Sequence, residues 1–107
     1  MEKTWQETLS DILNGYFGYQ SLEVGVKEMI FVTRWNQDYH QRYVAAIQSG
    51  ITAASQGNSE VIGIIRHSLA RFVESTEEAQ QFLNELLSEY NVQYSIASND
   101  IPAKPST

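Results

Sequence analysis

The sequence contains no cysteine, no long apolar run and no N-terminal segment of the basic kind that begins a signal peptide. Without cysteine, the chain can form neither a disulfide framework nor a thiolate zinc site, and it has no cysteine nucleophile. Its apolar runs span only a few residues, whereas a membrane-spanning helix needs about 20. The N-terminus "MEKTWQETLSD" carries acids where a signal peptide carries basic residues followed by an apolar segment. These absences predict a protein that stays in the cytoplasm.

Catalytic motifs are also missing. There is no HExxH spacing, no glycine-rich phosphate loop and no serine in a nucleophile-elbow context. The two histidines, His40 and His67, would form a metal or acid–base site only if they converged with a carboxylate. We therefore expect a non-enzyme that needs no metal and no cofactor. A small metal-dependent enzyme using both histidines is the weakest of three hypotheses.

Basic residues are absent from the segment between Phe72 and Ala103, which carries six acids. The first 71 residues hold seven acids and six bases, so the net charge of −6 arises mainly in the C-terminal third. A nucleic-acid binder needs the opposite sign to meet phosphate. The charge pattern therefore argues against nucleic acid as a ligand and favours a basic macromolecular partner.

Helical periodicity dominates the N-terminal part, although Asn14-Gly15 followed by alternating aromatics could also begin a hairpin. Thr4 and Glu7 have the spacing of a capping box. An apolar stripe at 3.6-residue spacing then favours a helix over a strand. Gly18 is the expected left-handed C-cap. The stripe consists of Trp5, Leu9, Ile12, Leu13, Tyr16 and Phe17.

The rest of the chain predicts further helices and one ambiguous segment. Residues 21–35 could begin as a strand, but a loop followed by a helix over about 26–35 is favoured. Asp38 is the expected N-cap of the next helix, whose stripe includes alanine and glycine and so predicts close helix packing. The motif "SQGN" is a break, followed by a helix capped by Asn58 or Ser59. Its stripe is Val61, Ile64, Ile65, Leu69 and Phe72.

A second capping box, Ser75 to Glu78, begins the last helix, which is expected to end at Asn91. The predicted fold class is all-α, a compact bundle or array of four to five helices. Residues 1–95 would form a single helical domain. Residues 96–107 would be a flexible C-terminal tail.

Glutamates of the last helix fall on one edge, with Glu78, Glu85 and Glu89 in line and Glu74 just ahead of the capping box. Glu85 and Glu89 are like charges one turn apart, which costs about 0.2–0.5 kcal/mol. One interpretation is a solvated face that favours solubility. The other is an acidic surface that attracts and docks a basic partner.

The stretch "LSDILNGYFGYQ", Leu9 to Gln20, resembles the N-terminal helix of small bacterial contact-dependent growth inhibition (CDI) immunity proteins. Tyr16 and Phe17 match that family's motif, and the acidic-apolar helix "STEEAQQFLNELLSEYNVQY" matches its layout. The resemblance implies a cytoplasmic protein that binds one cognate toxin domain, commonly a nuclease, and blocks its active site or substrate groove.

Together, charge and resemblance predict a toxin-binding protein that forms a 1:1 complex with a basic toxin domain and contacts neither nucleic acid nor membrane. The expected contact residues are Glu74, Glu78, Glu85, Glu89, Asp38 and Tyr39. The alternative is a small acidic helical adaptor or regulatory protein-binding module. Such a module would self-associate or present a nonpolar partner surface, and its binding would not depend on salt.

Overall fold

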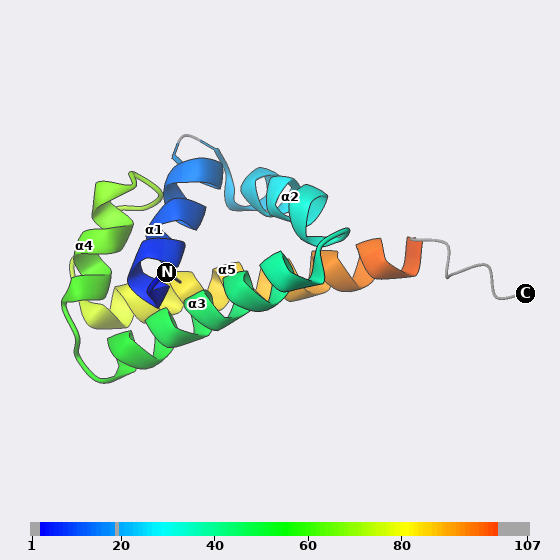
Figure 1. Cartoon of the computed structure of the whole chain (residues 1–107). Helices are drawn as coiled ribbons and strands as arrows, with labels where there is room; N and C mark the ends of the chain where they lie inside the picture. Colours follow the sequence, from blue (N-terminus) through cyan, green and yellow to red (C-terminus); the bar gives the residue numbers. More distant parts are fainter. Residues whose placement is uncertain (1–2, 19, 101–107) are drawn as a thin grey trace, which may run out of the picture.

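The computed structural model describes residues 3–18 and 20–100, which form five helices and no strand (Figure 1). The all-α prediction is therefore confirmed. The helices are α1 (Trp5–Tyr16), α2 (Leu22–Thr33), α3 (Gln37–Ser55), α4 (Glu60–His67) and α5 (Thr76–Asp100).

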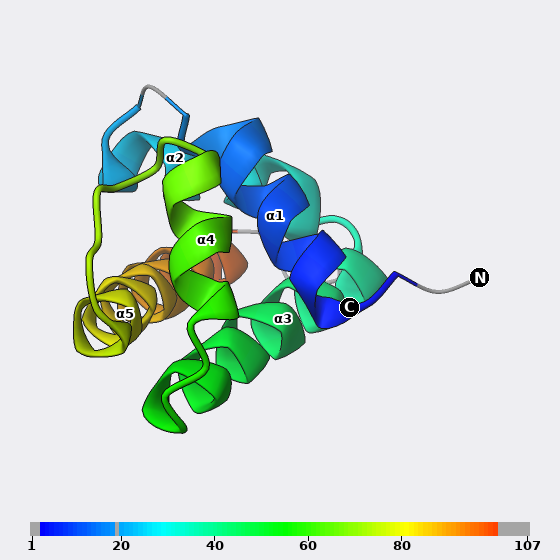
Figure 2. The ribbon, with the colours of Figure 1, turned by 90° about the vertical axis from the view of Figure 1, so that its left-hand side faces the viewer.

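The two longest helices, α3 and α5, run antiparallel along the long axis of the molecule (Figure 1). α1, α2 and α4 lie across this pair, and Figure 2 shows α1 and α4 side by side above it. The principal extents are 52 × 31 × 21 Å. Since α1 covers α3, and α2 and α4 also contact α5, all five helices share one core.

The N-terminal helix begins as predicted but ends differently. The Glu7 backbone N–H donates to Thr4 Oγ1, and the Glu7 carboxylate accepts from the Thr4 backbone, each at 3.1 Å. The prediction that Gly18 is a left-handed C-cap is wrong. Phe17 is the C-cap, and Gly18 does not have a positive φ, which among the glycines described is found at Gly57. Phe17 is buried against α2, so tertiary packing replaces the glycine cap.

The second and third helices both start at residues other than those predicted. α2 begins at Leu22 rather than near residue 26, because the Ser21 hydroxyl accepts from the Val24 N–H at 3.3 Å. The prediction of Asp38 as N-cap is wrong. Asn36 is the last extended residue, and its Oδ1 accepts from the backbone of Asp38 at 3.1 Å and of Tyr39 at 3.2 Å.

The predicted stripe of α4 is too long. α4 ends at His67, and Leu69 and Phe72 are exposed rather than packed in the core. The Ser68 hydroxyl donates to the Ile65 carbonyl at 2.7 Å and accepts from the Ala70 N–H at 3.2 Å, so it satisfies groups that a further helical turn would have used. Leu69 then turns the chain with φ of +63°.

The last helix is longer than predicted. It continues past Asn91 to Asp100, because Tyr94 and Ala97 still pack against the core. The first residues assigned to a flexible tail, 96–100, are therefore helical. Residues 101–107 lie outside the described residues, as does Tyr19, so the prediction of a flexible end is untested there.

Small residues bring the helices close together. A Cβ on Gly50 of α3 would lie 3.0 Å from Leu83 Cδ1 of α5 and 3.0 Å from Leu9 Cδ2 of α1. Gly25 of α2 is closer still to its neighbours, since a Cβ there would lie 2.3 Å from Phe17 Cε1 and 2.7 Å from the Tyr16 carbonyl oxygen. The glycine in α3 confirms the close packing that its stripe predicted.

Substituting Gly25→Ala should lower the free energy of unfolding by about 3 kcal/mol, because the new methyl group overlaps a buried ring and backbone. The matched control is Gly63→Ala on the exposed side of α4, where nothing lies within 4 Å. This control should raise the free energy of unfolding by about 1 kcal/mol, because alanine has a higher helix propensity than glycine by that amount. Urea unfolding measures both. Equal stability of the Gly25 variant and the parent protein would contradict the close contact between α1 and α2.

Candidate functional site

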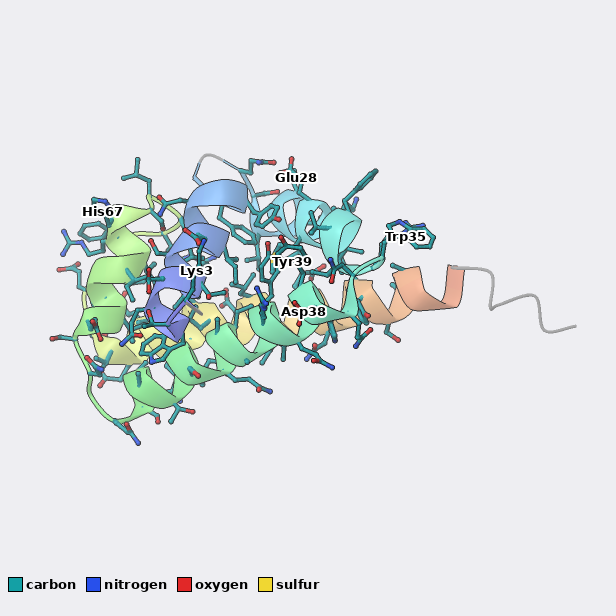
Figure 3. The ribbon with its side chains drawn as sticks, in the orientation of Figure 1. Lys3, Glu28, Trp35, Asp38, Tyr39 and His67 are labelled. Atoms are coloured by element: carbon teal, nitrogen blue, oxygen red, sulfur yellow. The ribbon has the colours of Figure 1, made fainter. Side chains whose placement is uncertain are left out.

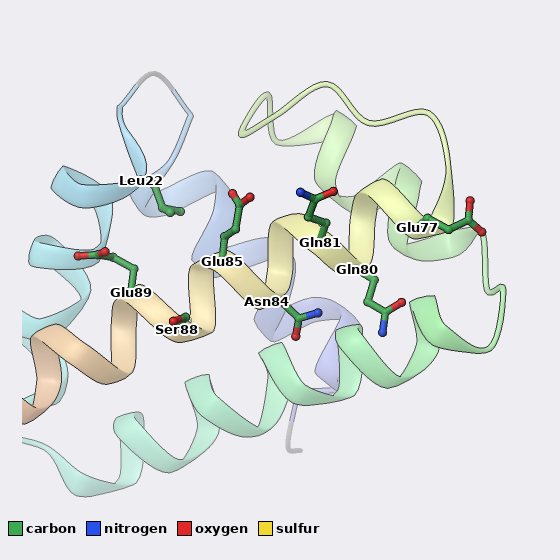
Figure 4. A pocket seen from close by; sticks show the side chains of 8 residues that line it. All are labelled: Leu22, Glu77, Gln80, Gln81, Asn84, Glu85, Ser88 and Glu89. Carbon is green, nitrogen blue, oxygen red and sulfur yellow. The ribbon is translucent and has the colours of Figure 1, made fainter.

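The outward side of α5 is a polar surface. It forms a shallow, open depression bordered by Leu22 of α2, and Figure 4 shows the side chains that line it. We call its polar members the α5 face. They are Glu77, Gln80, Gln81, Asn84, Glu85, Ser88 and Glu89.

The spacing of apolar residues in α5 determines which side faces outward. Ala79, Phe82, Leu83, Leu86 and Tyr90 are buried and recur every three or four residues, so they form the side that packs on the core. The polar residues between them are left on the opposite side. Sequence analysis placed Glu85 and Glu89 on this side, with Gln81 between the glutamates. It missed Glu77, Gln80 and Asn84, because only the acidic edge of the helix was followed.

Two of the predicted contact residues lie where α5 begins, Glu78 in its first turn and Glu74 two residues before it. The Glu78 N–H donates to Ser75 Oγ at 3.1 Å, and the Glu78 carboxylate accepts from the Glu74 backbone at 3.1 Å. Glu78 therefore caps the helix and lies outside the depression. Reversing its charge would remove the cap as well as the charge, so it is a poor probe of binding.

Glu85 and Glu89 make contacts within the chain. Arg71, from the connection before α5, forms an ion pair with Glu85 at 3.0 Å, and its guanidinium lies 4.7 Å from the centre of the Phe82 ring. Glu89 accepts a hydrogen bond from Gln93 at 2.6 Å. One basic side chain thus offsets one carboxylate, and the face as a whole remains acidic.

Asp38 and Tyr39 lie elsewhere. They are at the start of α3, and Figure 3 shows them on the side that faces the viewer. The α5 face is seen from another direction in Figure 4, with α5 in front and α1 behind it. Asp38 pairs with Arg42 one turn later, at 3.0 Å. The structure therefore does not bring these two residues together with the glutamates of α5. Sequence spacing could not show this, because it depends on how α3 packs.

Tyr39 lines a second site, a cleft of about 760 Å³ between α1 and α3. Its walls carry the Lys3–Asp11 ion pair, Trp5 and Arg42. Tyr43 lies beside Tyr39 and its hydroxyl is 3.2 Å from that of Tyr16, and burial raises the pKa of Tyr43. Sequence analysis missed this cleft because its two walls are formed by residues 3–11 and 39–49, which are far apart in the sequence.

The histidines lie in different environments. His40 is half-buried, stacks on Tyr94 with ring centres 3.9 Å apart, and places Nδ1 2.8 Å from the Tyr90 hydroxyl. Burial raises the pKa of Tyr90 to about 12, so the hydroxyl keeps its proton and can donate to neutral imidazole. Burial also lowers the pKa of His40. His67 is exposed at the end of α4, at the far left of Figure 3.

Among residues 3–18 and 20–100, no group of three or more histidine, aspartate or glutamate side chains is arranged to hold a metal ion. None of the helices described is both long and apolar enough to cross a bilayer. Comparisons with protein-family models, curated proteins and solved structures found no match. A functional assignment therefore depends on the α5 face, the cleft and the exposed apolar side chains.

The lowered pKa of His40 makes stability depend on pH. The unfolded chain binds a proton at His40 near pH 6.5, whereas the folded chain binds it only at lower pH. The stability contribution is therefore complete above about pH 6.5 and is lost as pH falls through 6.5 towards the folded pKa. His40→Phe, which keeps a ring on Tyr94 but cannot titrate, should flatten this part of the profile. Urea unfolding at pH 8 and pH 5.5 tests it, and an unchanged slope would contradict the role of His40.

Proposed function

We propose that the chain is a non-enzymatic cytoplasmic immunity protein that binds and neutralises a cognate CDI toxin domain, a basic nuclease. The observation that carries this proposal is the α5 face, where the exposed Glu77 and Glu85 and the half-buried Glu89 line one open surface. No lysine or arginine belongs to α5 among the residues described. The resemblance of Leu9 to Gln20 to the CDI immunity family supports the same assignment.

The chemistry of the α5 face fits a nuclease. An enzyme that grips phosphate presents lysine and arginine in its substrate groove, and carboxylates on a rigid helix can occupy the same positions. Gln80, Gln81 and Asn84 add hydrogen-bond donors and acceptors between the charges. The negative field would also raise the rate of association. Binding there would cover the groove in a 1:1 complex.

Neutralising the face should slow association without unfolding the chain. The triple variant Glu77→Gln, Glu85→Gln, Glu89→Gln leaves the Glu78 cap intact, and we expect it to lower the association rate by about tenfold or more at low salt. The partner for this test is the basic C-terminal domain of the large secreted protein that the proposal expects the neighbouring upstream reading frame to encode. Stopped-flow measurements at low and high salt follow the rate, and the difference should shrink as salt screens the charges.

The matched control is Asp11→Asn, Glu23→Gln, Glu60→Gln, which changes net charge equally but lies outside the α5 face. It should reduce the rate far less. Equal loss in both variants would mean that only net charge matters. Failure of the adjacent toxin domain to bind the parent protein would contradict the immunity function itself.

The alternative is a small acidic adaptor or regulatory module with an apolar partner contact. The observation that favours it is the corner between α4 and α5, where Leu69 and Phe72 are 61% and 67% exposed. Leu69 occupies the left-handed position after a helix, where glycine is strongly preferred. The guanidinium of Arg66 lies 4.6 Å from the centre of the Phe72 ring. Such a contact would be insensitive to salt.

Leu69→Gly separates the two functions. It should raise the free energy of unfolding by about 1 kcal/mol, because glycine adopts the left-handed conformation without steric cost. If the corner is the partner contact, the same change should weaken binding severalfold, measured by titration calorimetry. If the α5 face is the contact, affinity should be unchanged. A loss of stability would contradict the account of the α4 end given above.

A further inference from the structure

The last turns of α5 have few contacts with the rest of the chain. We call residues 91–100 the α5 end, and Figure 1 shows it (orange) reaching beyond the other helices. Of its apolar side chains, Tyr94 and Ala97 pack against the core, whereas Val92 and Ile96 are exposed. Asparagine, valine, tyrosine and serine also favour a helix less than the leucine and glutamate of the preceding turns. The helical form of the α5 end therefore depends on what it packs against.

Tyr94 makes the main contact of the α5 end, and its partner is His40 at the start of α3. The two rings stack with their centres 3.9 Å apart and their planes 10° apart. The Tyr94 hydroxyl also donates to Gln37 Oε1 at 3.4 Å, and Gln93 Nε2 donates to the Glu23 carbonyl of α2 at 3.4 Å. The α5 end is thus docked mainly through one titratable ring.

The same contacts bury His40. Tyr94 covers one side of the imidazole, and the Tyr90 hydroxyl lies 2.8 Å from Nδ1. A neutral imidazole can accept this hydrogen bond, and burial lowers the pKa of His40. Undocking the α5 end would return one side of the ring to water while Tyr90, which is fully buried, stays in the core.

The titratable and charged groups on the helices around His40 give it no carboxylate partner among the residues described. They are Tyr90, Tyr94 and Glu89 of α5, Arg34 of α2, Tyr16 of α1, and Asp38, Arg42 and Tyr43 of α3. Asp38 pairs with Arg42 at 3.0 Å, and Glu89 accepts from Gln93. Burial rather than a charged neighbour therefore determines which form of His40 the docked state prefers.

We propose that the α5 end is a pH-sensitive element, docked on α3 while His40 is neutral and released when His40 is protonated. Docking would bury the imidazolium charge without a counter-charge, whereas release lets water solvate it. Release is local because the buried residues of α5 before Asn91 keep their contacts. The shortened helix would end near Asn91, where the local sequence favours a helix end.

Amide hydrogen exchange of the parent protein, followed by NMR at pH 8 and pH 5.5, tests the release. Residues 92–97 should exchange faster than residues 82–86 at both pH values, which identifies a local opening. Their protection factors should fall severalfold at pH 5.5, and by at most about tenfold. This limit follows because a released His40 with its ordinary pKa of 6.5 is then about ten parts protonated to one part neutral.

Equal protection of residues 92–97 at the two pH values would overturn the proposal. That result is expected if a cation–π contact with Tyr94 holds the imidazolium in the stack. Protection factors rather than raw rates are compared, since they correct for the pH dependence of intrinsic exchange.

Histidine variants test whether His40 is the responsible group. His40→Phe keeps a ring on Tyr94 but cannot titrate, so the protection of residues 92–97 should no longer depend on pH. The matched control is His67→Phe, at the exposed end of α4, which should retain the full response. His40→Gln, which still offers an acceptor to Tyr90, serves where the phenylalanine variant does not fold. A full pH response in a folded His40 variant would overturn the proposal.

The coupling must also act in the opposite direction, from the α5 end to His40. Tyr94→Ala removes the stack, so the pKa of His40, followed by NMR titration, should rise towards 6.5. The matched control is Ile96→Ala on the exposed side of the same segment, which should leave this pKa unchanged. An unchanged pKa in Tyr94→Ala would mean that the α5 end does not bury His40, and would overturn the proposal.

The pH response of the α5 end does not depend on the proposed toxin-binding function. All of these measurements use the chain alone, so their outcome stands whether or not a toxin domain binds. The α5 face ends at Glu89, before the α5 end begins, and remains on a helix when the end is released. A pH-independent α5 end would therefore leave the predictions for the α5 face unaffected.

Discussion

The antiparallel contact between α3 and α5 is the constraint on which the rest of the structure depends. Gly50 allows it, because Leu83 of α5 and Leu9 of α1 approach the α3 backbone to distances that leave no room for a larger side chain. Three helices therefore meet at one residue. The other helices pack on this pair, and the buried side chains of all five form one continuous core.

This contact also determines where the functional candidates lie. Once α5 packs its apolar side on α3 and α2, its glutamates and amides must face away from the core. Asp38 and Tyr39, at the start of α3, then lie apart from the α5 face, and Tyr39 lines the cleft between α1 and α3. The glutamates of α5 and the pair Asp38 and Tyr39, which the sequence assigned to one contact, therefore lie on different surfaces. The cleft and the α5 face are therefore two separate surfaces.

The exposed apolar residues are informative because the core does not need them. Leu69 accepts a left-handed backbone conformation where glycine would be less strained. Phe31 of α2 and Trp35 just after it are exposed, and none of the helices described covers them. Isolated exposed apolar residues are common in proteins, but an aromatic pair one turn apart on a helix that is already buried on its other side is not. Leu69, Phe31 and Trp35 are therefore candidates for contact with another molecule.

The sequence by itself determined the helical class, the Thr4 and Ser75 caps, the break after α3 and the base-free acidic segment, because each is a local property of spacing or composition. Only the tertiary structure decided the remaining features. Phe17 ends α1 by packing under α2, and Tyr94 extends α5 by packing on the core. The pairing of Arg71 with Glu85 joins residues 14 positions apart. Such outcomes depend on which side chains meet across helices, and helical spacing alone carries no information about that.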